Sequence, residues 1–392
     1  PASDSSSATA YSFQRKTWYD GTRFWNAFYS GSTIEFYYSS DWGSTWTQNT
    51  SATIAVSTND FSIEADSSNA FITYTNGFDI EARSASTYPG TGFSWSAATV
   101  VYDGSSSTDD YDYPAITQDS NNKVWITATH LSSTNYLFKS VQSTNANDIS
   151  AWGSASTLDT STNSNKYGTI VSLGSGNVYA VWIDGTAIEG SKYTGSWGSV
   201  DSIATGVTGL TNNMSAVSDS SGNVHLLYID SSDYAVYQEY TTSWQTAVTL
   251  DSNAGNDYAT ISLDTSNNDL YALWIRSNVI YYKKGVSPYA SANWDASATS
   301  WKSTGTNVYV TSNYSGDGMI YAQWTSGTSS PYSVNWDYII IPEKLTFLLG
   351  LGLIVPFLLK RRKKVNIKKK FKKAISEIIR RECKKMKCIP KF

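Results

Sequence analysis

Short runs in which apolar and polar residues alternate fill the first 337 positions of the chain, and turns rich in Asp, Ser, Gly and Asn separate them. The apolar positions hold mainly aromatic and β-branched residues, as in Val178-Tyr-Ala-Val-Trp182. Residues of this kind are typical of strands with a pleated, half-buried surface. The chain has 15 Trp, 28 Tyr and 13 Phe but only 16% charged residues, a balance that excludes a disordered chain or a coiled coil. The pattern therefore predicts an all-β body.

A unit made of a polar turn and a short aromatic strand recurs seven times in residues 11–337. Successive copies are 45 to 55 residues apart when they are measured between the turn residues Gly21, Asn69, Asn122, Asn177, Asn223, Asn268 and Gly318. Repeats of this length are typical of four-stranded propeller blades. The sequence therefore predicts a β-propeller, most simply with seven blades, over residues 11–337, after a Ser-rich segment at residues 1–10.

A second element, a polar pair followed by an aromatic and several small residues, precedes most of these turns. Small residues suit the crowded innermost strand of a blade, so the loops before these strands are expected around one mouth of the central channel. The residues expected there are Asp60, Asp112, Tyr113, Lys166, Tyr167, Asn213, Asp257 and Tyr258. Tyrosine stacks on sugar rings, and Asn and Asp bond to hydroxyl groups, so this mouth is a candidate ligand-binding site. The alternative is that the tyrosines only close the ends of the blades.

Charge divides the chain into two regions of opposite sign. Residues 1–359 hold 13 Lys/Arg and 31 Asp/Glu, whereas residues 360–392 hold 16 Lys/Arg and 2 Glu. An acidic body with a basic tail is the asymmetry expected when a membrane separates the two. The acidic exterior of the body also disfavours nucleic acid as a partner.

An apolar stretch lies between the two charged regions. Residues 345–359 carry no charge, and counting from Tyr338 gives 22 residues, or about 33 Å of helix against a hydrocarbon core of about 30 Å. Lys360-Arg-Arg-Lys-Lys364 follows directly, and the positive-inside rule places such a cluster in the cytoplasm. The sequence predicts a transmembrane helix at 338–359, an extracellular body on the cell surface and a cytoplasmic tail at 360–392. The alternative is a buried core helix.

The tail itself has an amphipathic pattern. The apolar residues Phe371, Ala374, Ile375, Ile378, Ile379 and Met386 fall near one helical stripe, with lysines elsewhere. This pattern predicts a basic helix on the anionic inner leaflet, with a solvated tail as the alternative. Ile341-Pro342-Glu343 and Arg361-Arg362 resemble the two ends of prokaryotic surface-sorting tails. Those tails stop after the basic cluster, whereas this one continues for 28 residues past Lys364, which favours a retained anchor.

One turn carries a specific motif. Ser39, Asp41, Gly43, Thr45 and Trp46 match the pattern S-x-D-x-G-x-T-W at every fixed position. The motif resembles the Asp-box of sialidase-like (BNR-repeat) propellers. In that family the box is structural and lies away from the active site, so the resemblance implies a fold and not an activity. We expect Asp41 to accept backbone N–H groups across the turn and Gly43 to adopt a positive φ.

The chain lacks most of the catalytic pattern that this resemblance brings with it. Sialidases of this fold hold the substrate carboxylate with three arginines and use a Tyr nucleophile, a partner Glu and an Asp acid. The body has only Arg15, Arg23, Arg83 and Arg276, and the family's F/Y-R-I-P entry motif is absent. Convergence of three of these arginines from separate repeats stays open, and it would favour an enzyme.

Other chemistry is sparse. Asp109, Asp110 and Asp112 are the best acids for glycoside hydrolysis, which needs two facing carboxylates, but a solvated acidic loop is the simpler interpretation. The two histidines, His130 and His225, are expected to pack in second strands. Because no metal cluster, nucleotide loop or Ser-His-Asp arrangement stands out, we predict no cofactor and no metal.

Together these features predict a membrane-anchored cell-surface propeller that acts as a non-catalytic recognition, adhesion or envelope-structural module. Its expected ligand is a glycan or a surface protein. The alternative is a divergent sialidase-like glycoside hydrolase.

Overall fold

The structure, a computed structural model, describes residues 1–208, 213–303, 305–306 and 309–340. The chain divides into two units, Pro1–Ile340 and Ile341–Phe392, of which the second lies outside the described residues. In the part of the chain that is described, no helix has the length and apolar character that crossing a membrane requires. The predicted helix at 338–359 and the predicted basic helix of the tail at 360–392 fall almost entirely outside these residues.

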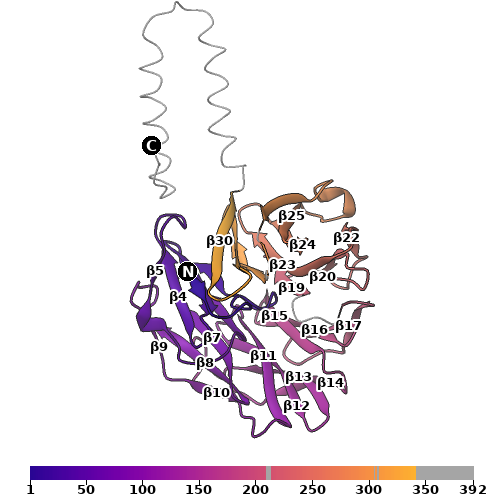
Figure 1. The fold of residues 1–392 in the computed structure, drawn as a ribbon. Coiled ribbons are helices and arrows are strands. Elements are labelled where there is room, and N and C mark those ends of the chain that lie inside the picture. The colour runs from indigo at the N-terminus through magenta and orange to yellow at the C-terminus, as the bar shows by residue number, and fades with distance from the viewer. Residues whose placement is uncertain (209–212, 304, 307–308, 341–392) are drawn as a thin grey trace, which may run out of the picture. The chain divides into compact units, whose positions relative to one another are not determined.

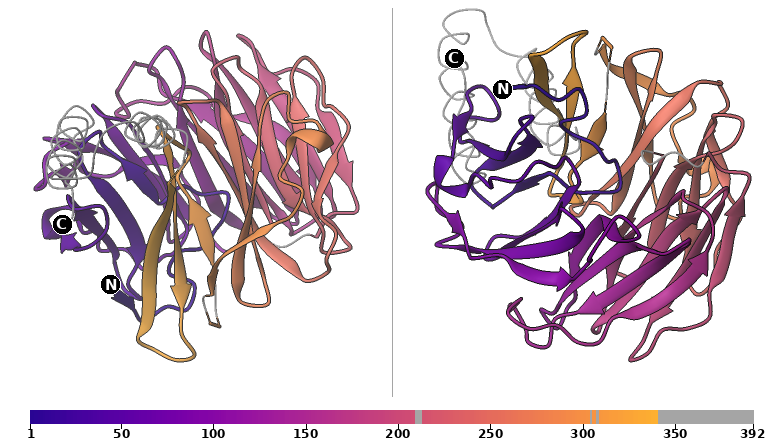
Figure 2. Two further views of the ribbon diagram at one scale, coloured as in Figure 1. Left: turned by 90° about the horizontal axis from the view of Figure 1, so that it is seen from above. Right: turned by 60° about the horizontal axis from the view of Figure 1, so that its bottom comes forward.

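Seven blades surround a central axis, and the described body is all-β as predicted (Figures 1 and 2). The strands of each blade are given from the inner strand outward. The first blade consists of β2 (Thr17–Tyr19), β3 (Phe24–Tyr29), β4 (Ile34–Ser39) and β5 (Thr47–Gln48), and the second of β6 (Phe61–Ala65), β7 (Ala70–Asn76), β8 (Asp79–Ser86) and β10 (Thr99–Tyr102), with β9 (Ser94–Trp95) beside β8. The third blade consists of β11 (Asp109–Gln118), β12 (Val124–Ser132), β13 (Asn135–Gln142) and β14 (Ser156–Ser161).

The next three blades follow the same antiparallel order. The fourth blade consists of β15 (Lys166–Gly174), β16 (Asn177–Asp184), β17 (Ala187–Tyr193) and β18 (Asp201–Thr205), and the fifth of β19 (Met214–Ser218), β20 (Val224–Ile229), β21 (Ala235–Tyr240) and β22 (Val248–Asp251). The sixth consists of β23 (Asn256–Asp264), β24 (Asp269–Arg276), β25 (Val279–Gly285) and β26 (Thr299–Ser303), with β28 (Ser315–Gly316) parallel to β23. Two short 3₁₀ turns, η1 (Thr50–Ala52) and η2 (Ser291–Asn293), lie in connecting loops.

The seventh blade joins the two ends of the body. It consists of β27 (Val310–Ser312), β29 (Met319–Ser326), β30 (Tyr332–Ile340) and, from the other end of the chain, β1 (Ala2–Ser3). Pairing with β1 covers part of the outer edge of β30, and an uncovered edge would be a template for aggregation.

The structure corrects both predicted boundaries of the propeller. The Ser-rich segment at 1–10 belongs to the body, because it supplies β1. At the other boundary, Tyr338 and Ile339 pair with Tyr321 and Ile320 of β29. The first three residues of the predicted transmembrane helix, 338–340, are therefore the end of strand β30.

The recurring turn has a clear structural role. In the third blade, Asp119 Oδ1 accepts two backbone N–H groups of its own turn at 2.8 and 3.0 Å, and Oδ2 accepts the indole N–H of Trp125 at 2.8 Å. Asp20 makes the same kind of contact with Trp25 at 2.7 Å. The second strands are buried on both faces, and Trp25, Trp182 and Trp274 are fully buried. One carboxylate thus fixes the turn and orients a large core side chain.

The N-terminal segment fills part of the central channel. Phe13 is 1% exposed and stacks on Tyr167 with ring centres 5.4 Å apart. Bonds from the segment to the innermost strands or the loops before them are Ser12 Oγ to Met214 O (3.2 Å), Gln14 Nε2 to Pro114 O (2.9 Å), Arg15 Nη2 to Ala216 O (2.8 Å), Thr169 Oγ1 to Phe13 O (3.3 Å) and Thr311 Oγ1 to Gln14 O (2.7 Å). We call residues 11–16 the channel segment.

Candidate functional site

The tyrosines predicted at the channel mouth surround the channel segment. Tyr113 packs edge-on against Tyr11 at 5.4 Å, and Tyr167 is fully buried beneath Phe13. Tyr258 packs instead against Tyr309, with ring centres 5.0 Å apart. Each of these rings therefore contacts another aromatic ring of the protein, while Tyr113 and Tyr258 stay partly exposed.

Two other predicted mouth residues join neighbouring blades. Asp60 Oδ2 accepts the backbone N–H of Tyr113 at 2.7 Å, and Asn213 Oδ1 accepts that of Tyr258 at 2.9 Å. Both tyrosines have positive φ values, 58° and 55°, where the strand register shifts. A side chain of one blade thus satisfies a backbone group that an irregularity in the next blade leaves without a ladder partner.

Lys166 is also committed to the interior of the protein. Its ammonium group is completely buried, forms an ion pair with Asp159 and lies 3.1 Å from Asp184. The carboxylates of Asp159, Asp184 and Glu189 come close enough together to hold a metal ion. Because the Lys166 ammonium already lies against two of them, the group is explained as an internal ion-pair cluster.

The predicted acids lie in different surroundings. Asp109 is bonded to His130 Nε2 at 2.7 Å and to Ser105 Oγ at 2.7 Å. Burial, followed by repulsion from Asp60 and Asp110, raises the pKa of Asp112 to about 7. Burial also raises the pKa of Asp257, which belongs to another blade. A catalytic pair needs two carboxyl groups on opposite sides of a bound glycosidic bond, and Asp109 is already bonded to a histidine and a serine of the protein.

The four arginines of the body are dispersed. Arg23 forms an ion pair with Asp20 at 3.5 Å and bonds to Pro89 O, whereas Arg83 bonds to the hydroxyl group of Tyr74. Arg276 pairs with Asp251. Only Arg15 lies in the channel, so a three-arginine carboxylate clamp is not assembled.

The two histidines pack as predicted. His130 lies in β12 and stacks flat on Tyr111 at 4.0 Å, in addition to its bond to Asp109. His225 is fully buried in β20 and bonds to the Tyr237 hydroxyl at 2.8 Å.

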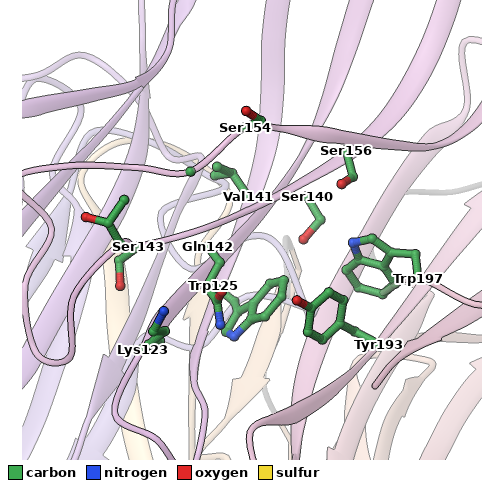
Figure 3. Close-up of a pocket in the computed structure, with 12 residues that line it drawn as sticks. Lys123, Trp125, Ser140, Val141, Gln142, Ser143, Ser154, Ser156, Tyr193 and Trp197 are labelled. Carbon is green, nitrogen blue, oxygen red and sulfur yellow. The ribbon is translucent and has the colours of Figure 1, made fainter. Parts of the chain in front are cut away.

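A pocket that the sequence did not predict opens between the third and fourth blades (Figure 3). Its volume is about 350 Å³, and its lining includes Lys123, Trp125, Ser140, Gln142, Ser154, Ser156, Tyr193 and Trp197. Trp125 comes from β12, whereas Tyr193 and Trp197 come from the β17–β18 hairpin of the next blade. We call it the inter-blade pocket.

Three aromatic rings form one wall of the inter-blade pocket. Trp125 lies 4.7 Å from Tyr193 and 5.9 Å from Trp197, and Tyr193 lies 5.5 Å from Trp197. All three pairs meet at steep angles, between 62° and 88°. Trp125 is buried, while Tyr193 and Trp197 are partly exposed. The wall therefore offers apolar ring surface beside polar groups.

One buried hydroxyl group without a partner faces this wall. Ser140 is 1% exposed, yet its hydroxyl group has no hydrogen-bond partner. In Figure 3 the hydroxyl groups of Ser140 and Ser156 and the indole nitrogen of Trp197 lie around the same opening. A buried hydroxyl group without a partner costs free energy, and a ligand hydroxyl group would remove that cost.

At the neighbouring interface, between the fourth and fifth blades, the corresponding aromatic side chains contact one another directly. There the indole Nε1 of Trp244 donates directly to the Tyr179 hydroxyl at 2.8 Å, and Tyr240 packs on Tyr179 at 4.8 Å. The recurrence of tryptophan near the fourth strands is visible in the sequence. The sequence does not show which ring of the next blade each tryptophan contacts, because that depends on how the blades pack.

Comparison with solved structures shows what the fold is similar to. The BP39L lectin from Burkholderia pseudomallei matches with a TM-score of 0.61 at 10% identity, over 84% of this chain and 97% of that one. AofleA from Arthrobotrys oligospora matches with a TM-score of 0.50 at 12% identity, over 78% and 94%. The polysaccharide lyase Uly1 matches with a TM-score of 0.49 at 8% identity, over 86% and 91%.

At these identities the likeness shows the fold alone, and the class defined here is a seven-bladed β-propeller with a lectin among its structural neighbours. No family model matches the chain, and no curated protein matches it either. The sialidase-like resemblance of residues 39–46 and the sorting-tail resemblance of the C-terminal region therefore stay predictions.

Proposed function

We propose that this protein is a non-catalytic glycan-recognition module, a seven-bladed propeller displayed on the cell surface by its C-terminal segment. The inter-blade pocket carries the proposal. Its volume of about 350 Å³ lies within the range of small-ligand sites, about 300–1,000 Å³. Sugars combine an apolar ring face with several hydroxyl groups, and this pocket places three aromatic rings beside an unpartnered serine hydroxyl group.

The comparison with a lectin supports the same proposal. The BP39L structure is named a lectin, and its fold covers most of this chain. A propeller of this kind is therefore a scaffold on which a carbohydrate site can be built, although the site must be argued from this chain's own residues. The dispersed arginines favour binding over hydrolysis of the sialidase type.

The site can be tested with the 392-residue chain on an array of defined glycans. We expect binding to a subset of glycans, and we expect Trp197→Ala to abolish it because the stacking wall loses a ring. Trp244→Ala is the matched control, since it removes the corresponding tryptophan from the interface between the fourth and fifth blades. It should lower the melting temperature and leave glycan binding intact. Equal binding by the parent and the Trp197 variant would contradict the assignment.

The display at the cell surface is a separate part of the proposal. It rests on the uncharged stretch at 345–359 and the basic residues that follow it. Protease treatment of intact cells should remove an epitope in residues 1–337 and spare an epitope in the tail. Protection of the body epitope would place the propeller on the other side of the membrane.

A further inference from the structure

A second, larger cavity lies on the propeller axis, at the end of the channel where the innermost strands reach their C-terminal ends. Its volume is about 530 Å³, and the innermost strands of all seven blades or the loops beside them contribute to its wall. The residues that matter for its chemistry are Arg15, Glu64, Asp66, Asp219, Asn313 and Tyr314. We call it the axial cavity. It is separate from the inter-blade pocket, with which it shares no lining residue.

Arg15 supplies a buried positive charge at this cavity. It is 6% exposed, and its guanidinium group bonds to Ala216 O at 2.8 Å and to Ser312 O at 3.3 Å. Its Cζ lies 5.6 Å from the centre of the Tyr314 ring. In the described part of the chain Arg15 forms no ion pair, unlike Arg23. Burial lowers the pKa of Arg15 to about 10, which leaves it charged at neutral pH. All the groups that bond directly to its guanidinium group are therefore neutral.

Glu64 does not supply the missing negative charge near neutral pH. Burial, followed by repulsion from Asp66, raises its pKa to about 8, while Arg15 acts in the opposite direction. The other titratable groups at the cavity are Asp66, Asp219 and three tyrosines, Tyr19, Tyr314 and Tyr321. Burial raises the pKa of Tyr314 to about 12. The carboxylates of Asp66 and Asp219 accept backbone N–H groups of their own turns. Glu64 thus offers mainly a hydrogen-bond donor to the cavity below pH 8.

Asn313 adds an unpartnered donor. It is 1% exposed, and its side-chain nitrogen Nδ2 has no hydrogen-bond partner. The orientation of the amide is fixed by its oxygen, because Oδ1 accepts the backbone N–H of Tyr321 at 3.0 Å. Turning the amide over would lose that bond. The cavity therefore combines a buried cation, a free amide donor and Glu64 with the carboxylates of Asp66 and Asp219.

We propose that the axial cavity binds a small carboxylate-bearing ligand, such as a uronic-acid residue of an acidic glycan. Arg15 supplies a positive charge, and Asn313 and protonated Glu64 supply donors, whereas the carboxylates of Asp66 and Asp219 already accept N–H groups of their own turns. The ligand that complements the first three groups presents a negatively charged acceptor. A neutral sugar fits the volume but leaves the charge of Arg15 uncompensated. The ligand class follows from this donor set, and it differs from the ligand proposed for the inter-blade pocket.

D-glucuronate and D-glucose form a matched pair of probes, because they differ only in the carboxylate. Calorimetric titration of the 392-residue chain at pH 6 should show glucuronate binding at least tenfold tighter than glucose. Asn313→Asp keeps the acceptor for Tyr321 and replaces the donor with a negative charge, so glucuronate affinity should fall at least tenfold. Equal affinity for the two sugars, or an unchanged affinity in a folded Asn313 variant, would overturn the proposal.

Glu64→Gln provides a second test that does not depend on the stability of the Asn313 variant. In the parent chain, glucuronate binding should weaken as the pH rises from 7 to 9, since ionised Glu64 repels the ligand. The Gln variant keeps a donor and should bind with little change over this range. An identical pH dependence in both proteins would rule out Glu64 as part of the site. Ser191→Ala, at a residue that lines neither cavity, is the control and should leave glucuronate binding unchanged.

Discussion

Gly43 and Trp336 touch so closely that the glycine position has no room for a side chain. A Cβ atom at Gly43 would lie 2.3 Å from Cζ3 of Trp336, and Gly43 has a φ of +76°. Trp46 of the same turn meets Trp336 edge-on at 5.2 Å. The Asp-box turn of the first blade is therefore packed against β30 of the seventh blade. This contact stabilises the interface between the first and the last blade.

Replacing Gly43 with Ala should destabilise the protein strongly. The new side chain meets both the left-handed backbone and the Trp336 ring, and together these effects cost about 2–4 kcal/mol. Chemical denaturation measures the loss. Glycan binding by the folded fraction should be unchanged, because neither pocket includes Gly43. A variant as stable as the parent would show that the blade contact is not maintained in solution.

Asp41→Ala should have a smaller effect. Asp41 accepts the Thr45 backbone N–H and hydroxyl group, both at 2.8 Å, while Gly43 N–H donates to Ser39 Oγ at 2.7 Å. This is the turn chemistry that the motif predicts. The turn is open to water, which replaces the lost bonds, so the expected cost is about 1 kcal/mol. Loss of glycan binding without loss of stability would make the turn a binding element instead.

The repeated turns made the fold predictable from the sequence. Asp119 and its counterparts carry local information, because the carboxylate binds backbone groups only a few residues away. The inter-blade pocket was not predictable in this way. Trp125 meets Trp197 through the packing of two blades, and neither residue marks its partner in the sequence.

The contacts made by the residues of the predicted channel mouth were not predictable from the sequence, for a similar reason. The sequence pattern placed Tyr113 and Tyr167 at the start of inner strands, which is where they lie. It did not show that the channel segment would return to cover them, because Phe13 precedes the first repeat and resembles no part of it. The same segment brings Arg15 to the axial cavity.

The channel segment should contribute a large part of the stability. Phe13→Ala removes a ring that is 1% exposed and stacked on Tyr167, and such a truncation costs about 3–5 kcal/mol. Tyr19→Ala, at a side chain that is 37% exposed, is the control and should change stability little. Thermal unfolding followed by circular dichroism compares the two. Similar melting temperatures would mean that the segment does not occupy the channel.

Asp112 should make stability depend on pH. Its pKa is raised to about 7 in the folded protein, so the folded state binds this proton more tightly than the unfolded chain does. Stability from this group is therefore greatest at low pH and is lost as the pH rises from about 4 to about 7. Asp112→Asn should stabilise the protein at pH 8 and have little effect at pH 4. Denaturation curves at pH 8 and pH 4 measure the change in unfolding free energy. A larger stabilisation at pH 4 than at pH 8 would contradict the predicted direction.

Ser140→Ala provides the sharpest separation of binding from folding. The hydroxyl group is buried without a partner, so removing it should leave stability unchanged or raise it by about 1 kcal/mol. The same change removes a group that a bound sugar would satisfy, and affinity for the glycans selected on the array should fall by about threefold to tenfold. Ser191→Ala is the matched control, because that hydroxyl group already donates to Gly198 O at 3.1 Å. It should lower stability and spare binding. If Ser140→Ala destabilises the protein and leaves affinity unchanged, then its hydroxyl group has a structural partner and the inter-blade pocket is not the glycan site.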